Sequence, residues 1–427
     1  MTRVWKGRDW PLLDPAIFAG ALLLYALAMP LGLARVEGAS HVAAGLTVDT
    51  GAQPAIFALL AMRAGQFLPL GDTPLRANLA SAVLCALAIA LVGRLCLLAC
   101  RLLRPPTHAR QEPRDFAHEP LAAIGAALAA AFSLSTFDLG ATAGSAAATL
   151  AVLVAALLPG LVLLRDHNQS AAGILLAGVA GLSAGVDPVA GPLLWPPLVG
   201  LAIWSLRKGA RWPLLAPLCF VAAWGASVLA WVAAAPMPMA AVRLFSGLAQ
   251  LGMHHGGELG SSALELADEV GVVGSLLAAI GMVVLASRAA VLTAWLALTA
   301  LTSLLFTHSV ERAGAMGGPT RAALPLAIAI TCVFACVGIL HVSGRLGRAR
   351  LAATFALAAM IVLSPAMDSR RGLRRTLSPM RLLDRALLRA EVGSLVCPGT
   401  AEMDGLFFLA RAQGLRPDLE IGRCAGK

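Results

Sequence analysis

The sequence predicts an all-helical protein that crosses a membrane many times and ends in a small α/β segment. Of the 427 residues, 59% are apolar and only 13% are charged, whereas soluble domains carry about a quarter charged residues. Apolar runs recur along the chain, many of them near the ~18 residues from which a membrane-spanning helix is inferred. Basic residues also gather in alternate loops, which is typical of a membrane protein with one orientation.

The apolar runs predict eleven transmembrane segments. Their expected limits are 15–34, 77–100, 121–137, 143–164, 171–186, 189–206, 213–235, 270–287, 289–307, 322–342 and 351–367. A further apolar stretch, residues 54–70, contains Arg63 and Gln66. Because charge at mid-depth is costly in lipid, we expect this stretch to be a helix lying in the membrane interface. We expect the first segment to be an uncleaved helix, although Gly32-Leu33-Ala34 loosely resembles a signal-peptidase site.

Loop charge predicts an inside N-terminus. With that orientation the cytoplasmic loops hold most of the basic residues, at 101–119, Arg165, 207–211, Arg288 and 345–350. The long opposite loop, 236–269, has four acidic residues against Arg243 alone. An odd number of spans places the tail outside, in the periplasm if the chain lies in a bacterial inner membrane. Seven arginines between 370 and 389 oppose this, but long tails translocate largely regardless of charge. They form either a basic amphipathic helix near headgroups or a solvated helix face.

Two parts follow from this topology. Residues 1–367 form the membrane domain, with outer loops at 35–76 and 236–269, and residues 368–427 form a small extracytoplasmic domain. The net charge of +10 comes almost wholly from arginine, since the chain has only three lysines. We attribute this bias to base composition and expect no nucleic-acid partner. Six cysteines lie inside apolar runs and are expected to act as small hydrophobic residues, without a metal site: Cys85, Cys96, Cys100, Cys219, Cys332 and Cys336.

The tail holds the other two cysteines, Cys397 and Cys424. Cys397 ends the strand-like "GSLVC", and Cys424 follows the strand-like "LEIG". Between them "MDGLFFLARAQ" has the apolar spacing of a short helix, so the unit reads as two parallel, adjacent strands. Strands about 4.8 Å apart allow a disulfide, which persists in an oxidising compartment. We therefore predict a Cys397–Cys424 bridge, the alternative being two free thiols.

Two motifs near the ends of the chain point to a family. Leu68-Pro69-Leu70-Gly71 is followed by Arg76-Ala77-Asn78-Leu79-Ala80-Ser81-Ala82, and the tail contains Gly414-Leu415-Arg416-Pro417-Asp418. These blocks, in this order and spacing, resemble a bacterial family of unknown function related to the protein O-mannosyltransferases. That family belongs to the GT-C class of integral-membrane glycosyltransferases. The resemblance implies a GT-C-like fold for this chain.

The resemblance also implies an acidic residue in the first outer loop, acting as general base or holding a metal. Aligned back from Pro54 without gaps, the family's Asp-Ser-Gly-Glu keeps only Glu37, and its His-Pro-Pro-Gly-Tyr-Pro block becomes residues 49–54. The usual catalytic motifs are thus largely degenerate. Glu37 and Asp49 remain the catalytic candidates, because a carboxylate can take the acceptor proton or bind a cation at the leaving phosphate. The alternatives are solvated loop acids, or Glu37 neutralised by Arg35.

Two other polar clusters are candidate substrate-binding residues. Arg312 and Arg321 lie on either side of a Gly-rich turn. The planar guanidinium group of arginine can donate two parallel hydrogen bonds to a phosphate. The alternatives are that both arginines anchor helix ends, or that Arg312 pairs with Glu311. His254, His255 and Glu258 lie in the second large outer loop. Gly256 and Gly257 disfavour a helix there, so a flexible loop is the alternative to a ligand-binding cluster.

The predicted function is transfer of a sugar from a polyprenyl-phosphate-linked donor on the outer face of the bacterial inner membrane. Expected partners are this lipid-linked donor and membrane lipids, and the resemblance leaves a divalent cation open. One alternative is a catalytically degenerate homologue that serves as a scaffold or partner subunit in envelope glycan assembly. The other is a transporter of lipid-linked substrates, which would be expected to show internal repeats or paired broken helices; the sequence shows no convincing repeat.

Overall fold

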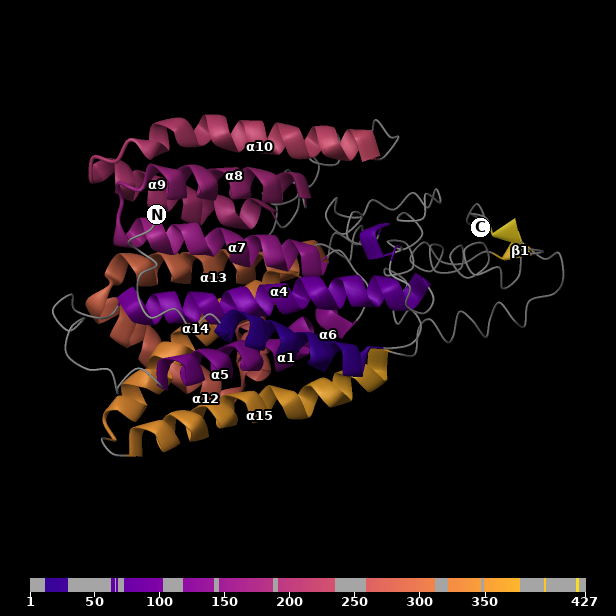
Figure 1. Ribbon diagram of the computed structural model, residues 1–427, viewed down its shortest axis with the longest axis vertical. Coiled ribbons are helices and arrows are strands. Elements are labelled where there is room, and N and C mark those ends of the chain that lie inside the picture. The colour runs from indigo at the N-terminus through magenta and orange to yellow at the C-terminus, as the bar shows by residue number, and fades with distance from the viewer. Residues whose placement is uncertain are drawn as a thin grey trace.

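The computed structural model shows a bundle of helices that run mostly along one axis (Figure 1). It describes residues 12–29, 63–65, 67, 73–102, 118–141, 146–186, 191–234, 259–311, 322–346, 349–376, 395–396 and 420–421. Almost all of these residues are helical, as the sequence predicts.

The described part of the chain contains twelve α-helices and one 3₁₀ turn. In chain order they are α1 (Leu13–Ala28), α4 (Thr73–Leu102), α5 (His118–Phe132), α6 (Leu134–Ala141), α7 (Ala146–Arg165), α8 (Ser170–Val186), the 3₁₀ turn η2 (Gly191–Leu194), α9 (Trp195–Arg207), α10 (Trp212–Ala234), α12 (Leu259–Arg288), α13 (Ala290–Glu311), α14 (Ala323–Gly344) and α15 (Arg350–Thr376). Each of the eleven apolar segments expected from the sequence includes residues that the structure describes as helical. Of the expected interfacial helix 54–70, only residues 63–65 and 67 are described, and 63–65 are helical.

Within the described ranges, length and apolar composition identify four helices that can cross a membrane. They are Leu75–Leu102, Ala146–Arg165, Ser262–Arg288 and Ala323–Gly344. A fifth crossing results if α5 and α6 form one bent span. Five further helices, α1, α8, α10, α13 and α15, contribute apolar stretches of 10–17 residues to this test. These stretches are shorter than the roughly 20 residues that cross a bilayer without tilt or thinning.

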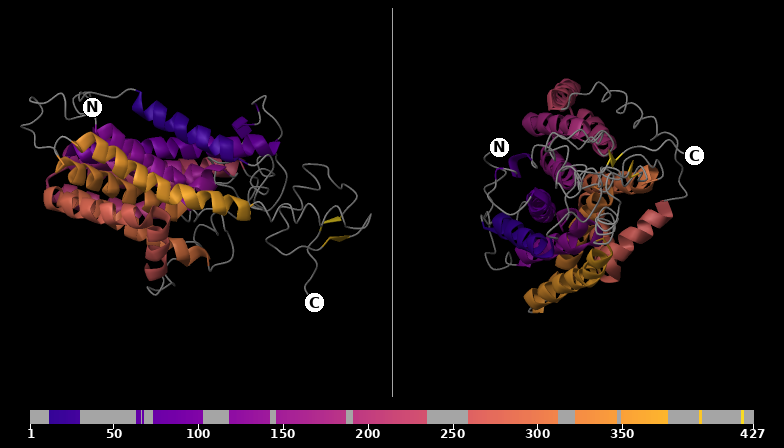
Figure 2. Two further views of the ribbon diagram at one scale, coloured as in Figure 1. Left: turned by 90° about the horizontal axis from the view of Figure 1, so that it is seen from below. Right: turned by 90° about the vertical axis from the view of Figure 1, so that its right-hand side faces the viewer.

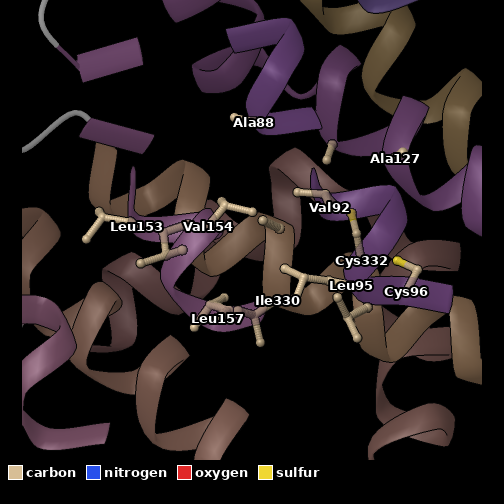
Figure 3. Close-up of a cluster of buried hydrophobic side chains, with 14 of the residues drawn as sticks. Ala88, Val92, Leu95, Cys96, Ala127, Leu153, Val154, Leu157, Ile330 and Cys332 are labelled. Atoms are coloured by element: carbon tan, nitrogen blue, oxygen red, sulfur yellow. The ribbon is translucent and has the colours of Figure 1, made fainter. Parts of the chain in front are cut away.

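Helix α14 forms the centre of the bundle. It packs against α12, α13, α5, α4, α15 and α7, and 89% of its most apolar window is buried. Figure 3 shows Ile330 and Cys332 of α14 beside Val92 and Leu95 of α4, with Leu157 of α7 near Ile330. These side chains are aliphatic or sulfur-containing, so this helix interface is held by close packing rather than by polar contacts.

The closest helix crossing is between α12 and α14. A Cβ atom placed on Gly281 would lie 1.8 Å from the carbonyl oxygen of Phe334, and one on Gly338 would lie 2.0 Å from that of Leu277. The backbones therefore touch at this crossing, and neither position has room for a side chain. Small residues at such positions are the usual means of close helix packing in membranes.

Helices α8 and α10 form a peripheral pair at one side of the bundle (Figure 1). Trp212, at the start of α10, is fully buried against Gly173 of α8, where a Cβ would lie within 2.5 Å of the indole ring. The opposite face of α10 exposes Leu214, Leu218 and Leu229. An exposed row of leucines suits contact with lipid tails.

Two short strands pair in the tail. β1 (Leu395–Val396) and β2 (Glu420–Ile421) are parallel, with Leu395 opposite Glu420 and Val396 opposite Ile421. This is the pairing that the sequence predicts for the strands beside the two tail cysteines. Cys397, Cys424 and the expected helix between the strands lie outside the described residues, so the disulfide stays a prediction.

Candidate functional site

The structure describes the helix ends beside the sequence-predicted site, but not the site residues themselves. Glu37, Asp49, His254, His255, Glu258, Arg312 and Arg321 all lie outside the described ranges. Helix α12 begins one residue after Glu258, and α13 ends one residue before Arg312. The Ser262 hydroxyl donates to the carbonyl of Leu304 at 3.1 Å. The two predicted substrate-binding segments are therefore attached to the same end of the bundle, which we call the outer end after the orientation expected from loop charge.

The outer end is built around a helix break that the sequence analysis did not predict. The span expected at 121–137 is instead α5, the single residue Ser133, and α6, with a bend of 73° between the two helices. The Ser133 N–H donates to Ala129 at 3.0 Å, so the last turn of α5 closes normally. The Ser133 carbonyl then accepts from the N–H of Phe137 at 2.8 Å, and this bond starts α6.

Serine chemistry explains why this break needs neither proline nor glycine. The Ser133 hydroxyl donates to the carbonyl of Ala130 at 2.9 Å and lies 2.8 Å from Oγ1 of Thr136. Helix ends leave N–H and carbonyl groups without partners, and short hydroxyl side chains satisfy them. All of this lies inside an apolar run, where hydropathy gives no warning of a break.

Glu269 of α12 accepts hydrogen bonds from the first turn of α6. Its Oε1 and Oε2 accept from the backbone N–H of Ser135 at 3.2 and 3.0 Å, and Oε2 also accepts from the Ser135 hydroxyl at 2.8 Å. The two residues are 134 positions apart in the chain. A half-buried carboxylate at a helix N-terminus is stabilised by the unsatisfied N–H groups and by the helix dipole. Glu269 thus ties α12 to α6, with three of its roughly four acceptor positions used on one serine.

Helices α1 and α4 also meet α6. Tyr25, the only tyrosine of the chain, is fully buried, and its ring packs edge-on to Phe137 with centroids 6.2 Å apart. Its hydroxyl lies 3.5 Å from the carbonyl of Ala131. A Cβ on Gly140 would come within 2.6 Å of the tyrosine ring, so this position has no room for a larger residue. Cys85 of α4 donates to the carbonyl of Thr136 at 3.6 Å.

These contacts link the three helices that precede or follow the loops with the predicted site residues. Helix α1 precedes the loop that carries Glu37 and Asp49, α12 follows the loop that carries the two histidines, and α13 precedes the segment with Arg312. All three helices are linked at the outer end through α6 or through one another. Sequence reasoning counted Glu269 only as a loop charge. The signal that was missed is the Ser133-Leu134-Ser135-Thr136 cluster inside an apolar run, together with an acid two residues before Gly271.

Helix α12 itself changes direction at Gly271. This glycine has φ 75° and ψ 164°, a combination that is essentially restricted to glycine. The first segment of α12, residues 259–270, turns away from the rest of the helix at this point (Figure 2). Glu269 therefore sits at the end of a separate helical segment, two residues before the bend.

A charge pair lies in the other half of the bundle, with its arginine mostly buried and its carboxylate partly exposed. Arg94 of α4 is 3.6 Å from Asp14 of α1. An ionisable residue within a membrane span indicates function unless it is paired for structural reasons. Here the arginine is only 15% exposed and faces a carboxylate from the neighbouring helix, so we interpret the pair as a tie between α1 and α4.

Several hydroxyl groups in the described helices bond within their own helix. The hydroxyls of Thr299 and Ser303 donate to carbonyls one turn earlier in α13, at 2.8 Å each. Cys100 of α4 and Cys336 of α14 have their sulfur atoms 3.8 Å apart. Within the described part of the chain, no group of three or more His, Cys, Asp or Glu side chains could hold a metal ion.

No protein-family model matches the chain, and no curated protein matches it significantly. The functional argument therefore rests on the sequence motifs and on the geometry of the outer end.

Proposed function

We propose that this protein is a GT-C-type membrane glycosyltransferase that uses a polyprenyl-phosphate-linked sugar at the outer face of a bacterial inner membrane. The observation that carries the proposal is that three loop-bearing helices are linked at one end of the bundle: α1 and α12 contact the broken helix α6, and α13 is hydrogen-bonded to α12. A transfer site needs a base near the acceptor and cations near the leaving phosphate, held in one place. The three loops that carry such residues in this sequence are attached side by side.

The membrane topology in this proposal has eleven crossings. Each expected segment contains described helix, and the exposed leucines of α10 fit a lipid-facing position at the edge of the bundle. Helices shorter than the bilayer are accommodated by local thinning or by tilt of their neighbours. The N-terminus is cytoplasmic and the tail periplasmic.

The chemical roles follow from residue type. Glu37 is the proposed general base toward the acceptor hydroxyl, and Asp49 supports it or helps to hold a divalent cation. Arg312 and Arg321 bind the lipid phosphate as planar forks. His254, His255 and Glu258 contact substrate from the loop before α12.

A catalytically degenerate homologue is the second candidate. It is favoured by one observation of the structure: Glu269, one of the carboxylates described at the outer end, is hydrogen-bonded to Ser135 and holds two helices together. It is also favoured by the loss of the family motif at residues 49–54. In that case the outer end serves as a docking surface for an envelope glycan enzyme.

Transfer by the purified protein in lipid nanodiscs tests the proposal. Radiolabelled polyprenyl-phosphate sugars serve as donors, and their hydrolysis or transfer is followed by release of the labelled sugar. Glu37→Gln keeps the side-chain size but removes the base, so turnover should fall about a hundredfold or more. The control is Asp166→Asn, an exposed acid in the short turn between α7 and α8, which should leave turnover unchanged. Activity that survives Glu37→Gln excludes that role, and no activity with any donor favours the degenerate homologue.

A further inference from the structure

Residues 259–270 of α12 form a segment that we call the strap. It lies at a steep angle to the rest of α12, at one side of the bundle (Figure 2). Near its start, the Ser262 hydroxyl donates to Leu304 of α13 at 3.1 Å. Near its end, Glu269 accepts three hydrogen bonds from Ser135 of α6. The strap therefore spans from one loop-bearing helix to the helix break.

The strap has a small apolar contact with the core. Half-buried Leu266 packs against the core, and Val270 at the end of the strap is buried in it. Leu264 is 70% exposed, and Ala263, Glu265 and Asp268 are also exposed. Segments with few buried apolar contacts open at low free energy, so the hydrogen bonds of Glu269 add to the contacts of Leu266 and Val270 in holding the strap in place.

Gly271 separates the strap from the rest of α12. Its φ of 75° lies in the region that only glycine adopts without strain. Beyond it, the helix is held against α14 by the backbone contact at Gly281. Rotation about Gly271 can thus move the strap while residues 272–288 stay fixed, which is how a hinge at the end of an element works.

We propose that the strap is a hinged cover of the outer end, with Gly271 as the hinge and the Glu269–Ser135 contact as its latch. Release of the latch frees the N–H groups at the start of α6 and lets the strap move away from α6. That the outer end then admits a lipid-linked substrate rests on the proposed function; the hinge and latch do not. Covers of this kind exclude water and commit a bound substrate in transferases and other enzymes.

Hydrogen–deuterium exchange of the full-length protein in nanodiscs tests the latch. Glu269→Ala removes all three acceptor contacts, and Ser135→Ala removes only the hydroxyl donor. Loss of hydrogen bonds to a carboxylate should raise exchange about tenfold in peptides from the strap and from the first turn of α6, with a smaller rise for Ser135→Ala. Peptides from 272–288 should keep the wild-type rate. The matched control is Asp268→Ala, which removes the adjacent, exposed acid and should change nothing.

Two outcomes would overturn the proposal. Equal exchange in Glu269→Ala and Asp268→Ala would show that the carboxylate does not hold the strap. Faster exchange over the whole of α12 would show that the strap is not hinged separately. An absence of glycosyl transfer alongside the expected exchange pattern would refute the proposed function while leaving the hinge and latch in place.

Discussion

Replacing Gly281 by alanine tests the closest helix contact of the bundle. The added methyl group would start 1.8 Å from the carbonyl oxygen of Phe334 and 2.8 Å from the backbone nitrogen of Gly338. Both neighbours are backbone atoms, so no side-chain rotation relieves the contact. To reach even a tight separation of about 3 Å, the two helices must move apart by about 1.2 Å, and such a gap forfeits roughly half of the dispersion energy of the surrounding contacts.

Overpacking of this kind costs about 1–3 kcal/mol in typical cores. We expect the upper end of that range, about 3 kcal/mol, because the crossing involves backbone on both sides. Gly225→Ala in α10 is the matched control, since a Cβ there meets nothing within 4 Å. In that position alanine should be neutral or stabilising by up to about 1 kcal/mol, as expected from helix propensity.

The cysteines of α14 provide the assay. Cys332 and Cys336 are buried close to Gly338, so in a protein whose other six cysteines are replaced, a thiol-reactive fluorescent dye reports when α14 separates from its neighbours during heating in detergent. Gly281→Ala should become reactive at a clearly lower temperature than Gly225→Ala. Identical midpoints for the two variants would refute the close crossing, and with it the fixed anchor that the hinge at Gly271 requires.

Two further predictions concern topology and the tail. Cysteines introduced at Gln111 and Ala263 of a cysteine-depleted protein should react with a membrane-impermeant maleimide in intact cells only at Ala263, which is exposed on the strap; labelling at Gln111 alone would reverse the orientation. Cys397 and Cys424 should resist alkylation until reduced in protein from an oxidising periplasm, because their strands are paired in parallel. Free thiols in non-reduced mass spectrometry would contradict the bridge.

Hydropathy located the helices but not their ends or breaks. The segment expected at 77–100 begins as helix at Thr73, and the one expected at 351–367 continues to Thr376. Hydropathy marks where residues favour lipid, whereas a helix continues as long as its backbone bonds and caps allow. Ser133 breaks an apolar run by local hydroxyl bonding, which leaves the average composition of the run unchanged.

Long-range pairs explain the other differences. Arg94 lies within the expected transmembrane segment 77–100, and its partner Asp14 is on another helix. Glu269 was expected in a solvated loop, and its partner Ser135 is equally remote in sequence. Periodicity and spacing describe neighbours along the chain, so they cannot show such contacts. The parallel pairing of 395–396 with 420–421 was predictable because a short strand–helix–strand unit is local.

The central place of α14 has a consequence for synthesis in the cell. A ribosome adds about 5–20 residues per second, so α14 emerges on the order of tens of seconds after α4 has entered the membrane. During that time the faces of α4, α5 and α12 that α14 will cover have no helix against them. Lipid or the insertion machinery must occupy this slot and then leave it. The bundle closes around a helix that is made nearly last, so a chain truncated before residue 323 would lack the element that its earlier helices enclose.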